Sequence, residues 1–182
     1  NIPGNNMPLV ALGTLILWLG WFFFNGGSQL KFDTMSDAQA LGKIFVNTNM
    51  AASGELLGAM IVSKLWTKRV VLNVTLNGAL AGLVVITADP LSPSPEFAIL
   101  YGLLGGILIP VSMTLLEKWG IDDPVGAISV HGIAGIIGLL LVPIFNIDGT
   151  ILAQLYGIGI IGGFVFTTSY AVWFILGKTI GI

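Results

Sequence analysis

Six apolar stretches separated by short polar connections set the pattern of the chain. They run over about residues 7–24, 40–66, 70–88, 97–116, 124–145 and 151–176. Each has about the length that a helix needs to cross roughly 30 Å of hydrocarbon. Backbone groups in lipid must be hydrogen-bonded within their own segment, so each stretch is predicted to be a helix. We therefore expect an all-α membrane protein with six transmembrane helices, in one domain over residues 1–182.

The composition supports a membrane protein and excludes several other classes. Residues are 55% hydrophobic and 9% charged, whereas soluble domains are about 25% charged. No basic run indicates nucleic-acid binding. The chain has no cysteine and a single histidine, so it offers neither a disulfide nor a zinc site of its own. No nucleotide loop or nucleophile triad appears, and we expect no enzyme activity, no metal and no cofactor.

The lysine and arginine residues predict how the helices are oriented. Five of the seven lie in or beside the connections after the second and fourth stretches or at the end of the chain: Lys64, Lys68, Arg69, Lys118 and Lys178. Cytoplasmic loops carry the excess of Lys and Arg, so these connections and both chain ends are predicted to face the cytoplasm of a multi-pass cell-membrane protein. Lys31 lies in the connection after the first stretch, close to Asp33 and Asp37, and acidic residues count little in this rule. The chain begins with Asn and ends close to a helix, and we expect a fragment of a longer protein.

Glycine is abundant, with 25 residues. Three pairs are spaced four residues apart: Gly78 with Gly82, Gly102 with Gly106, and Gly159 with Gly163. Small residues at this spacing allow two helix backbones to approach closely. The pairs predict tight helix packing, which does not by itself indicate a pore.

The segment GWFFFNGGS, residues 20–28, ends the first apolar stretch with four aromatic residues. Trp21, Phe24 and Ser28 are spaced i, i+3 and i+7, which places them on one helix face. Aromatic faces attract a cation by about 0.5–2 kcal/mol, and a hydroxyl can accept a hydrogen bond from it. These residues predict a cation site, with an interfacial aromatic belt as the alternative. Asn25 is expected to secure the helix end, and the glycines to permit close packing.

His131 is the only histidine. It lies seven residues after Pro124, about 10 Å along a helix that begins there. Ionisable groups inside a membrane usually mark a pathway or a proton relay, and histidine changes charge near neutral pH. The alternative is a buried neutral histidine bonded to a backbone carbonyl. A relay would need a second polar group across the lumen, and this chain has no second histidine.

Three other polar groups lie within the apolar stretches or at their ends. Glu55 lies near the middle of the second stretch, where it is either a proton or cation site or a protonated group bonded to a neighbouring helix. Asn47, Thr48 and Asn49 are expected to bond between helices. Asp122-Asp123-Pro124 resembles a helix start, with Asp as N-cap and Pro at the first helical position; a place at an inner pore mouth is the alternative.

Four segments together resemble a known family. GWFFFNGGS, FVNTNMAASG, LNGALAGLVVIT and GIDDPVGAISVHGIAG occur in this order and are similar to the second half of the ammonium transporter, methylammonium permease and Rhesus protein family. The resemblance implies an eleven-helix fold with two inverted repeats, of which this chain supplies the second repeat and the final helix, the last six transmembrane helices. It also implies a homotrimer with one pore per subunit.

The resemblance also implies roles for single residues. Phe24 matches a phenylalanine of the aromatic gate, and Ser28 matches the hydroxyl of the outer ammonium-recruitment site. His131 matches the second histidine of a pair that bridges the lumen. Trp21 matches a pore-lining tryptophan. Leu17, one turn before Trp21, and Ala127, one turn before His131, would line the apolar conduit. Glu55 departs from the family pattern, which has a small residue there.

The function implied by the resemblance is transport of ammonium or ammonia, with methylammonium as an analogue. Ammonium would be recruited outside, lose its proton with the help of histidine, and cross a hydrophobic pore as ammonia. Membrane lipid and a cytoplasmic regulatory protein of the PII type are the other implied partners. Two alternatives remain: an ammonium sensor of the same fold coupled to a signalling domain, and a polytopic bundle without a pore.

Overall fold

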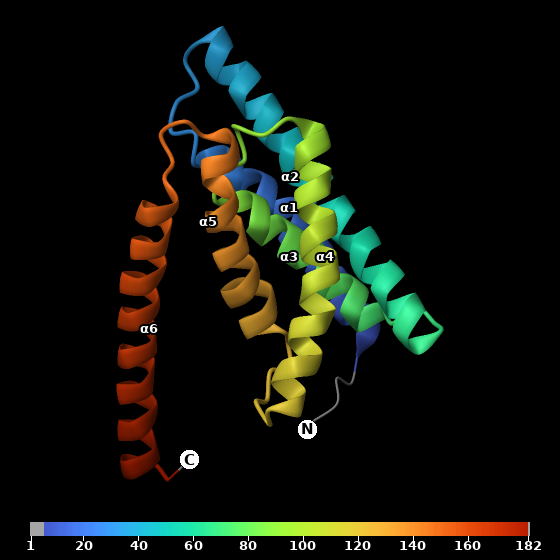
Figure 1. Cartoon of the computed structure of the whole chain (residues 1–182), viewed down its shortest axis with the longest axis vertical. Helices are drawn as coiled ribbons and strands as arrows, with labels where there is room; N and C mark the ends of the chain where they lie inside the picture. Colours follow the sequence, from blue (N-terminus) through green and yellow to red (C-terminus); the bar gives the residue numbers. More distant parts are fainter. Residues whose placement is uncertain (1–5, 182) are drawn as a thin grey trace.

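The computed structural model describes residues 6–181, which fold into helices without a strand (Figure 1). The elements are α1 (Met7–Gly27), α2 (Met35–Thr67), α3 (Leu72–Thr87), α4 (Pro95–Lys118), η1 (Ile128–Ile133), α5 (Ala134–Phe145) and α6 (Ile151–Thr179). Each of the six apolar stretches contains a helix, so the all-α prediction is confirmed.

Four helical segments are long and apolar enough to cross a membrane. They are Met7–Gly27, Pro95–Lys118, Ile128–Phe145 and Ile151–Thr179. α3 has 16 residues and is shorter. α2 has 33 residues, but polar residues such as Asn47 and Glu55 interrupt its apolar sequence. That α2 and α3 also cross the membrane, which would give six spans in all, therefore remains a prediction.

The fifth helix begins later than the sequence predicts. Pro124 lies in a turn and is not the first helical residue. A π-helix, η1, starts at Ile128 and passes directly into α5. Gly126 has φ +73°, a left-handed conformation that favours glycine and that separates the proline from the helix. The prediction of a helix over residues 124–145 is therefore wrong in its first residues.

Short polar side chains begin three of the helices. Asn6 accepts a hydrogen bond from the Leu9 amide at 2.9 Å, and Thr150 accepts one from the Ala153 amide at 3.2 Å. Thr34 and Asp37 form a reciprocal capping box at the start of α2. These bonds satisfy backbone donors that have no partner within the first helical turn. The polar connections seen in the sequence thus fix where helices begin.

α2 makes the most extensive contacts in the bundle, with α4 and with α3, and α3 and α4 also pack against each other. Gly82 of α3 and Gly102 of α4 both face the Ala51 carbonyl oxygen of α2, and a Cβ at Gly82 would lie 2.5 Å from it. A Cβ at Gly106 would meet the Glu55 carbonyl. Side chains at these positions would separate the backbones. The close packing predicted for the glycines of α3 and α4 is therefore confirmed.

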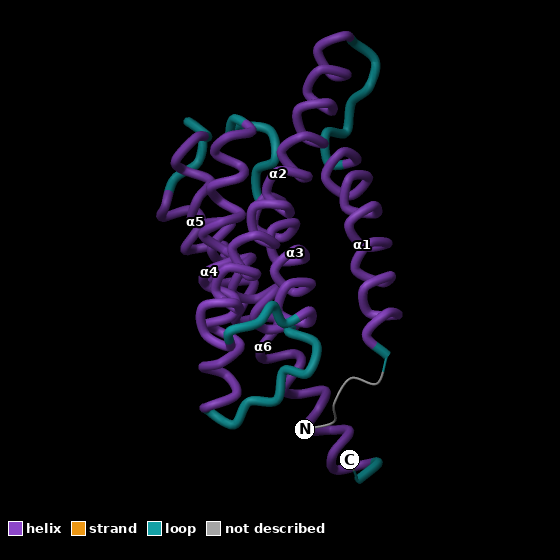
Figure 2. Tube along the Cα trace, turned by 90° about the vertical axis from the view of Figure 1, so that its right-hand side faces the viewer, coloured by secondary structure: helices purple, strands orange, loops and turns teal. Residues whose placement is uncertain are grey.

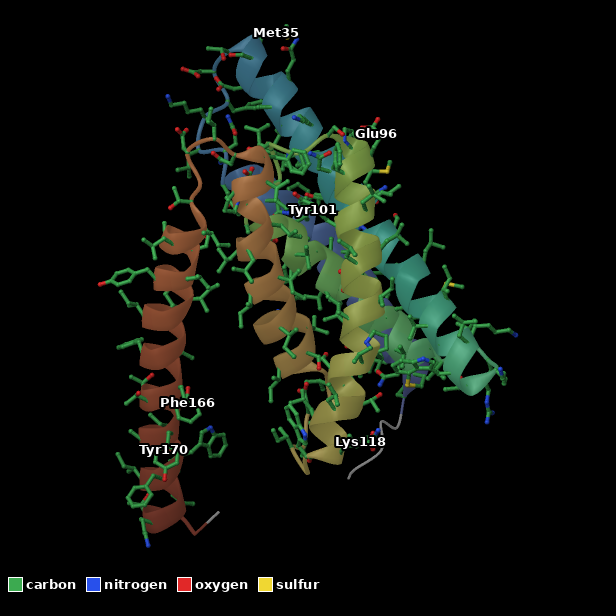
Figure 3. All side chains as sticks on the ribbon, viewed as in Figure 1. Met35, Glu96, Tyr101, Lys118, Phe166 and Tyr170 are labelled. Carbon is green, nitrogen blue, oxygen red and sulfur yellow. The ribbon has the colours of Figure 1, made fainter. Side chains whose placement is uncertain are left out.

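Next to this contact, α4 and α5 enclose aromatic side chains. Tyr101 is 8% exposed and lies between α4 and α5 (Figure 3). Its ring centroid is 5.8 Å from that of Phe145, which in turn is 4.6 Å from Phe97. Val130 and Ala134 extend the same apolar cluster into η1 and α5. This cluster fixes the position of η1, which carries His131.

α6 stands apart from the other helices. It has no buried residue and, within the described part of the chain, contacts only α5 (Figure 1). A Cβ at Gly159 or Gly163 would meet nothing within 4 Å, so the described chain supplies no partner for the close packing predicted there. Phe166 and Tyr170 lie on this separate helix (Figure 3).

The connections alternate between the two ends of the bundle. The α1–α2, α3–α4 and α5–α6 connections lie at one end, while the start of α1 and the end of α6 lie at the other (Figure 1). The α2–α3 and α4–η1 connections share this second end, and the tube view shows α1 along one side of the bundle (Figure 2). The connections that carry or adjoin Lys68, Arg69 and Lys118 therefore lie at the same end as the start of α1 and the end of α6. Lys31, in contrast, lies in the α1–α2 connection at the opposite end.

Candidate functional site

The end of α1 presents two adjacent aromatic rings. The centroids of Trp21 and Phe24 are 5.7 Å apart, with an angle of 47° between the rings. Phe24 is 61% exposed, and Trp21 is half-buried. The i, i+3 spacing thus brings both rings to one face, as predicted.

His131 joins this face from a distant part of the sequence. Its ring is stacked on Trp21, with centroids 6.5 Å apart and an angle of 26°. η1 carries the histidine to α1, and the imidazole is exposed. Trp21, Phe24 and His131 together form what we call the aromatic–histidine wall. It is a ring-lined surface with one titratable group, and it faces outward from the described chain.

The backbone around His131 differs from the expectation. The expectation placed His131 seven residues into a helix that begins at Pro124, whereas η1 begins at Ile128, only three residues before His131. Its ring makes no hydrogen bond to any described residue, so the described chain does not supply the carbonyl bond of the alternative interpretation, and the role of His131 stays a prediction. π-Helical turns are rare and often occur at functional sites. The wider turn places His131 on the exposed side while Ser129 and Val130 are buried.

Three other predicted residues each lie about one helical turn in sequence from a residue of the wall. Ser28 caps α1, is exposed, and its hydroxyl donates to the Phe24 carbonyl at 3.0 Å. The hydroxyl proton is thereby used, which leaves the oxygen free to accept. Leu17 is 49% exposed, and Ala127 is exposed just before η1. Their place in a conduit remains a prediction.

Asn25 holds the end of α1 against two other helices. It is 1% exposed, and its amide donates to the Thr48 hydroxyl of α2 at 3.0 Å. Thr87, the last residue of α3, lies 3.1 Å from the Asn25 carbonyl oxygen. Gly26 adds a close approach to α2, because a Cβ there would lie 2.6 Å from Phe45. The structural role expected for Asn25 is confirmed.

Asn47 and Thr48, which follow Phe45 in α2, hold neighbouring segments together by hydrogen bonds. Asn47 is buried and donates to the carbonyls of Pro90 and Pro93 at 2.9 and 2.8 Å. It thereby ties α2 to the α3–α4 connection, while Thr48 ties α2 to α1. The expected bond between helices is therefore formed by Thr48, whereas Asn47 bonds to a connection and the Asn49 side chain bonds to no described residue.

Glu55 lies apart from the wall. Its side chain is 0% exposed, and neither carboxyl oxygen has a hydrogen-bond partner among the described residues. The carboxyl fills the space in front of Gly105 of α4, where a Cβ would lie 2.5 Å from its Oε2. The bond to a neighbouring helix, which was one alternative, is therefore not formed by the described residues.

Asp123 caps the N-terminus of η1 although it lies five residues before the first η1 residue. Its carboxylate accepts hydrogen bonds from the Ile128 amide at 3.1 and 3.2 Å and from the Ser129 amide at 3.2 Å. A carboxylate at a helix N-terminus is favoured by the exposed N–H groups and the helix dipole. Capping by this Asp pair is thus confirmed for Asp123, although Pro124 does not begin the helix.

Replacing Asp123 with alanine is expected to destabilise the start of η1 by about 1 kcal/mol, the usual value of an N-cap. Its neighbour Asp122 provides a matched control, because no hydrogen bond from a described residue reaches its carboxylate. The thermal unfolding midpoint in detergent measures the effect. Equal midpoints for Asp123→Ala and Asp122→Ala would contradict the capping role.

A family model decides which proteins this chain resembles as a whole. The model for the Ammonium Transporter Family matches residues 1–182. The chain belongs to the ammonium transporter family. Among curated relatives, the ammonium transporter Amt2 of Archaeoglobus fulgidus is 37% identical over all of this chain and 42% of its own length. Ammonium transporter Amt2 of Methanocaldococcus jannaschii is 36% identical over 100% of this chain and 41% of its own length.

Solved structures of ammonium transporter relatives have the same fold. A chain described as a sensor Amt protein has a TM-score of 0.83 and 38% identity, covering 96% of this chain and 45% of its own. Mep2 of Candida albicans has a TM-score of 0.86 and 25% identity, covering 96% and 42%. The chain thus spans less than half the length of these ammonium transporter relatives. Membership of the family confirms the sequence resemblance and a multi-pass membrane protein.

Two features of this ammonium transporter chain were missed from the sequence. Thr87 accepts a hydrogen bond from the Trp21 indole N–H at 2.7 Å, although 66 residues separate them. Thr87 ends the segment LNGALAGLVVIT, so a polar residue at the end of an apolar helix was the available signal. The π-helix at His131 has no such signal, because its sequence is as apolar as an ordinary helix.

Proposed function

We propose that this chain lines one side of a transmembrane pathway for ammonium or ammonia. The carrying observation is the aromatic–histidine wall, in which Trp21 and His131 stack although 110 positions separate them in the chain. The wall is exposed over Phe24 and His131. A second protein surface facing it would enclose a ring-lined passage.

The wall supports a mechanism in which charge is removed before crossing. The Ser28 oxygen accepts an N–H bond from ammonium, and the Phe24 and Trp21 rings attract the cation by about 0.5–2 kcal/mol. Apolar walls below reject ions that lose their hydration without replacement. Ammonium therefore releases a proton and continues as ammonia, and the His131 ring nitrogens orient ammonia or relay the proton. Potassium has no proton to release and is excluded.

The same proposal includes the assembly and its surroundings. The pathway is completed by the other half of an eleven-helix subunit, and three subunits assemble, each with its own pathway. The end of the bundle that carries Lys64, Lys68 and Lys118 faces the cytoplasm. A regulatory protein of the PII type is the proposed cytoplasmic partner, and methylammonium is the proposed analogue of the substrate.

A second function has a specific observation in its favour. The 38% identical solved relative is described as a sensor Amt protein. A sensor would bind ammonium at the same wall and pass the signal to a further domain. Binding without uptake by the complete natural protein would favour the sensor, whereas uptake favours the transporter.

Replacing Phe24 with alanine tests the wall directly. Loss of the ring removes a cation–π contact and widens the entrance, so we expect the uptake ratio of ammonium to methylammonium to change by about three-fold or more. The measurement is uptake by cells that lack their own ammonium transporters and express the complete protein. Phe23, 70% exposed on the same helix, is the matched control.

Uptake by the unaltered protein, with a changed ratio for Phe24→Ala and an unchanged ratio for Phe23→Ala, is the expected result. A ratio unaffected by Phe24→Ala in a folded, normally assembled protein would contradict the gate. Absence of uptake by the unaltered protein would contradict transport itself.

A further inference from the structure

We propose that the Thr87 hydroxyl is a positioning group, which fixes the Trp21 indole in the aromatic–histidine wall and keeps its N–H away from ammonia. The inference rests on the proposed function, because it treats the wall as the lining of the pathway. Thr87 lies behind the wall, at the end of α3, and is half-buried. Its effect on a passing molecule would be exerted through Trp21.

The indole has one polar atom, and that atom is already bound. Trp21 Nε1 donates to Thr87 Oγ1 at 2.7 Å, and an indole nitrogen donates a single hydrogen bond and accepts none. The ring therefore offers only apolar carbon and its π face to the space in front. The neighbouring rings of Phe24 and His131 lie 5.7 and 6.5 Å away between centroids.

Thr87 is itself held in place by a chain of hydrogen bonds across three helices. Its single hydroxyl proton is shared between two acceptors, the Leu83 carbonyl at 2.6 Å and Asn25 Oδ1 at 3.1 Å. Asn25 in turn donates to Thr48 at 3.0 Å, and Thr48 donates to the Ile44 carbonyl at 2.7 Å. The Thr48 proton is used in its own helix, so its oxygen accepts from Asn25, which orients the Asn25 carbonyl oxygen toward Thr87.

Few residues of α1 are buried, so these bonds are an important part of its attachment to the bundle. Only Thr14, Asn25 and Gly26 of α1 are buried. Near Trp21, the hydrogen bond to Thr87 joins α1 to α3, and Asn25 joins α1 to α2. Loss of the Thr87 hydroxyl therefore leaves the indole without its partner, and no buried apolar side chain of α1 replaces that restraint.

The chemistry of the passing molecule gives the bound N–H a functional consequence. Ammonia carries a lone pair and accepts hydrogen bonds well. A free indole N–H in a dry passage would hold ammonia by a hydrogen bond with little competition from water. Occupying this N–H with Thr87 prevents such trapping and leaves His131 as the polar group of the wall. Thr87 thus determines that ammonia meets His131, and not the Trp21 N–H, as the hydrogen-bonding group of the wall.

The test replaces Thr87 with valine, which keeps the shape and removes the hydroxyl, and with serine, which keeps the hydroxyl. Thr75 provides a matched control: it lies in the same helix and bonds only its own helix, at the Val71 carbonyl, 3.1 Å away. Thr87→Ala serves if the valine variant does not accumulate in the membrane. Uptake of ammonium and methylammonium is measured for each variant, and for Thr87→Val combined with Trp21→Phe, which lacks the N–H.

We expect Thr87→Val to lower uptake about two- to ten-fold, the range for one neutral hydrogen bond. Thr87→Ser should restore uptake, Thr75→Val should leave it unchanged, and Thr87→Val should have no further effect in the Trp21→Phe background. Non-additivity of this kind identifies coupling between two side chains. A purely structural role for Thr87 would instead lower uptake in both backgrounds equally.

Three results would overturn the positioning role while transport by the unaltered protein remains intact. They are normal uptake by Thr87→Val, equal losses for Thr87→Val and Thr75→Val, and full additivity of Thr87→Val with Trp21→Phe. Absence of uptake by the unaltered protein would overturn the proposed function, on which this inference rests. The two failures are therefore distinguished by the unaltered protein alone.

Discussion

Uptake of methylammonium should fall at least about ten-fold when His131 is replaced with alanine in the complete protein. The reason is that His131 is the only titratable side chain in the aromatic–histidine wall, and its imidazole is exposed beside Trp21. A ten-fold loss corresponds to about 1.4 kcal/mol, which is close to the lower end of the range for one hydrogen bond to a charged group, about 1.5–3 kcal/mol. The alanine variant keeps the helix but offers no proton donor or acceptor there.

Uptake should be measured at several pH values in cells without their own ammonium transporters, together with the amount of folded protein in the membrane. Ile144→Ala is a suitable control, because Ile144 is 59% exposed near the other end of α5. Unchanged uptake by His131→Ala would support the alternative of a bundle without a pore. A loss shared by Ile144→Ala would indicate general damage to this helix.

Most of the fold followed from the apolar pattern. Residues 7–24 and 151–176 were expected to be helical, and α1 and α6 cover these ranges with only small extensions. Membrane helices are well predicted because backbone groups must be bonded within the segment. The glycine pairs of α3 and α4 correctly indicated close packing, because small residues at a spacing of four form one face.

The remaining differences have local causes. The start of the fifth helix was misplaced, because Pro124 and the Asp pair resemble an ordinary helix start, whereas Gly126 turns the chain first. Asp123 still caps the helix, but across five residues. The pairing of Trp21 with Thr87 depends on how α1 crosses α3, and the periodicity of each helix alone contains no information on that crossing.

The candidate site was predicted from the sequence only as separate residues. The spacing of Trp21 and Phe24 predicts one face, and the structure shows them in contact. The place of His131 beside them came from the family resemblance, since nothing in the local sequence joins η1 to α1. Glu55 was grouped with the site because of its charge, yet its carboxyl faces Gly105 in the contact between α2 and α4.

Replacing Gly105 with alanine should destabilise the protein by about 1–3 kcal/mol, the usual cost of overpacking. The new Cβ would lie 2.5 Å from Glu55 Oε2 and 2.6 Å from its Cδ. The carboxyl cannot move out toward solvent, because Glu55 is 0% exposed. The thermal unfolding midpoint in detergent measures the effect, with Gly162→Ala on α6 as control, since a Cβ there meets nothing within 4 Å.

The double variant Glu55→Ala/Gly105→Ala distinguishes a steric clash from other damage. Alanine at position 55 vacates the space in front of Gly105, so the double variant should be more stable than Gly105→Ala alone. Equal midpoints for the two would show that the carboxyl does not cause the destabilisation.

Glu55→Gln separates a packing role of Glu55 from proton or cation binding, because glutamine keeps the shape of the side chain and cannot ionise. We expect unaltered transport at every pH, since the carboxyl lies away from the wall, and a changed pH dependence would instead identify Glu55 as a proton or cation site.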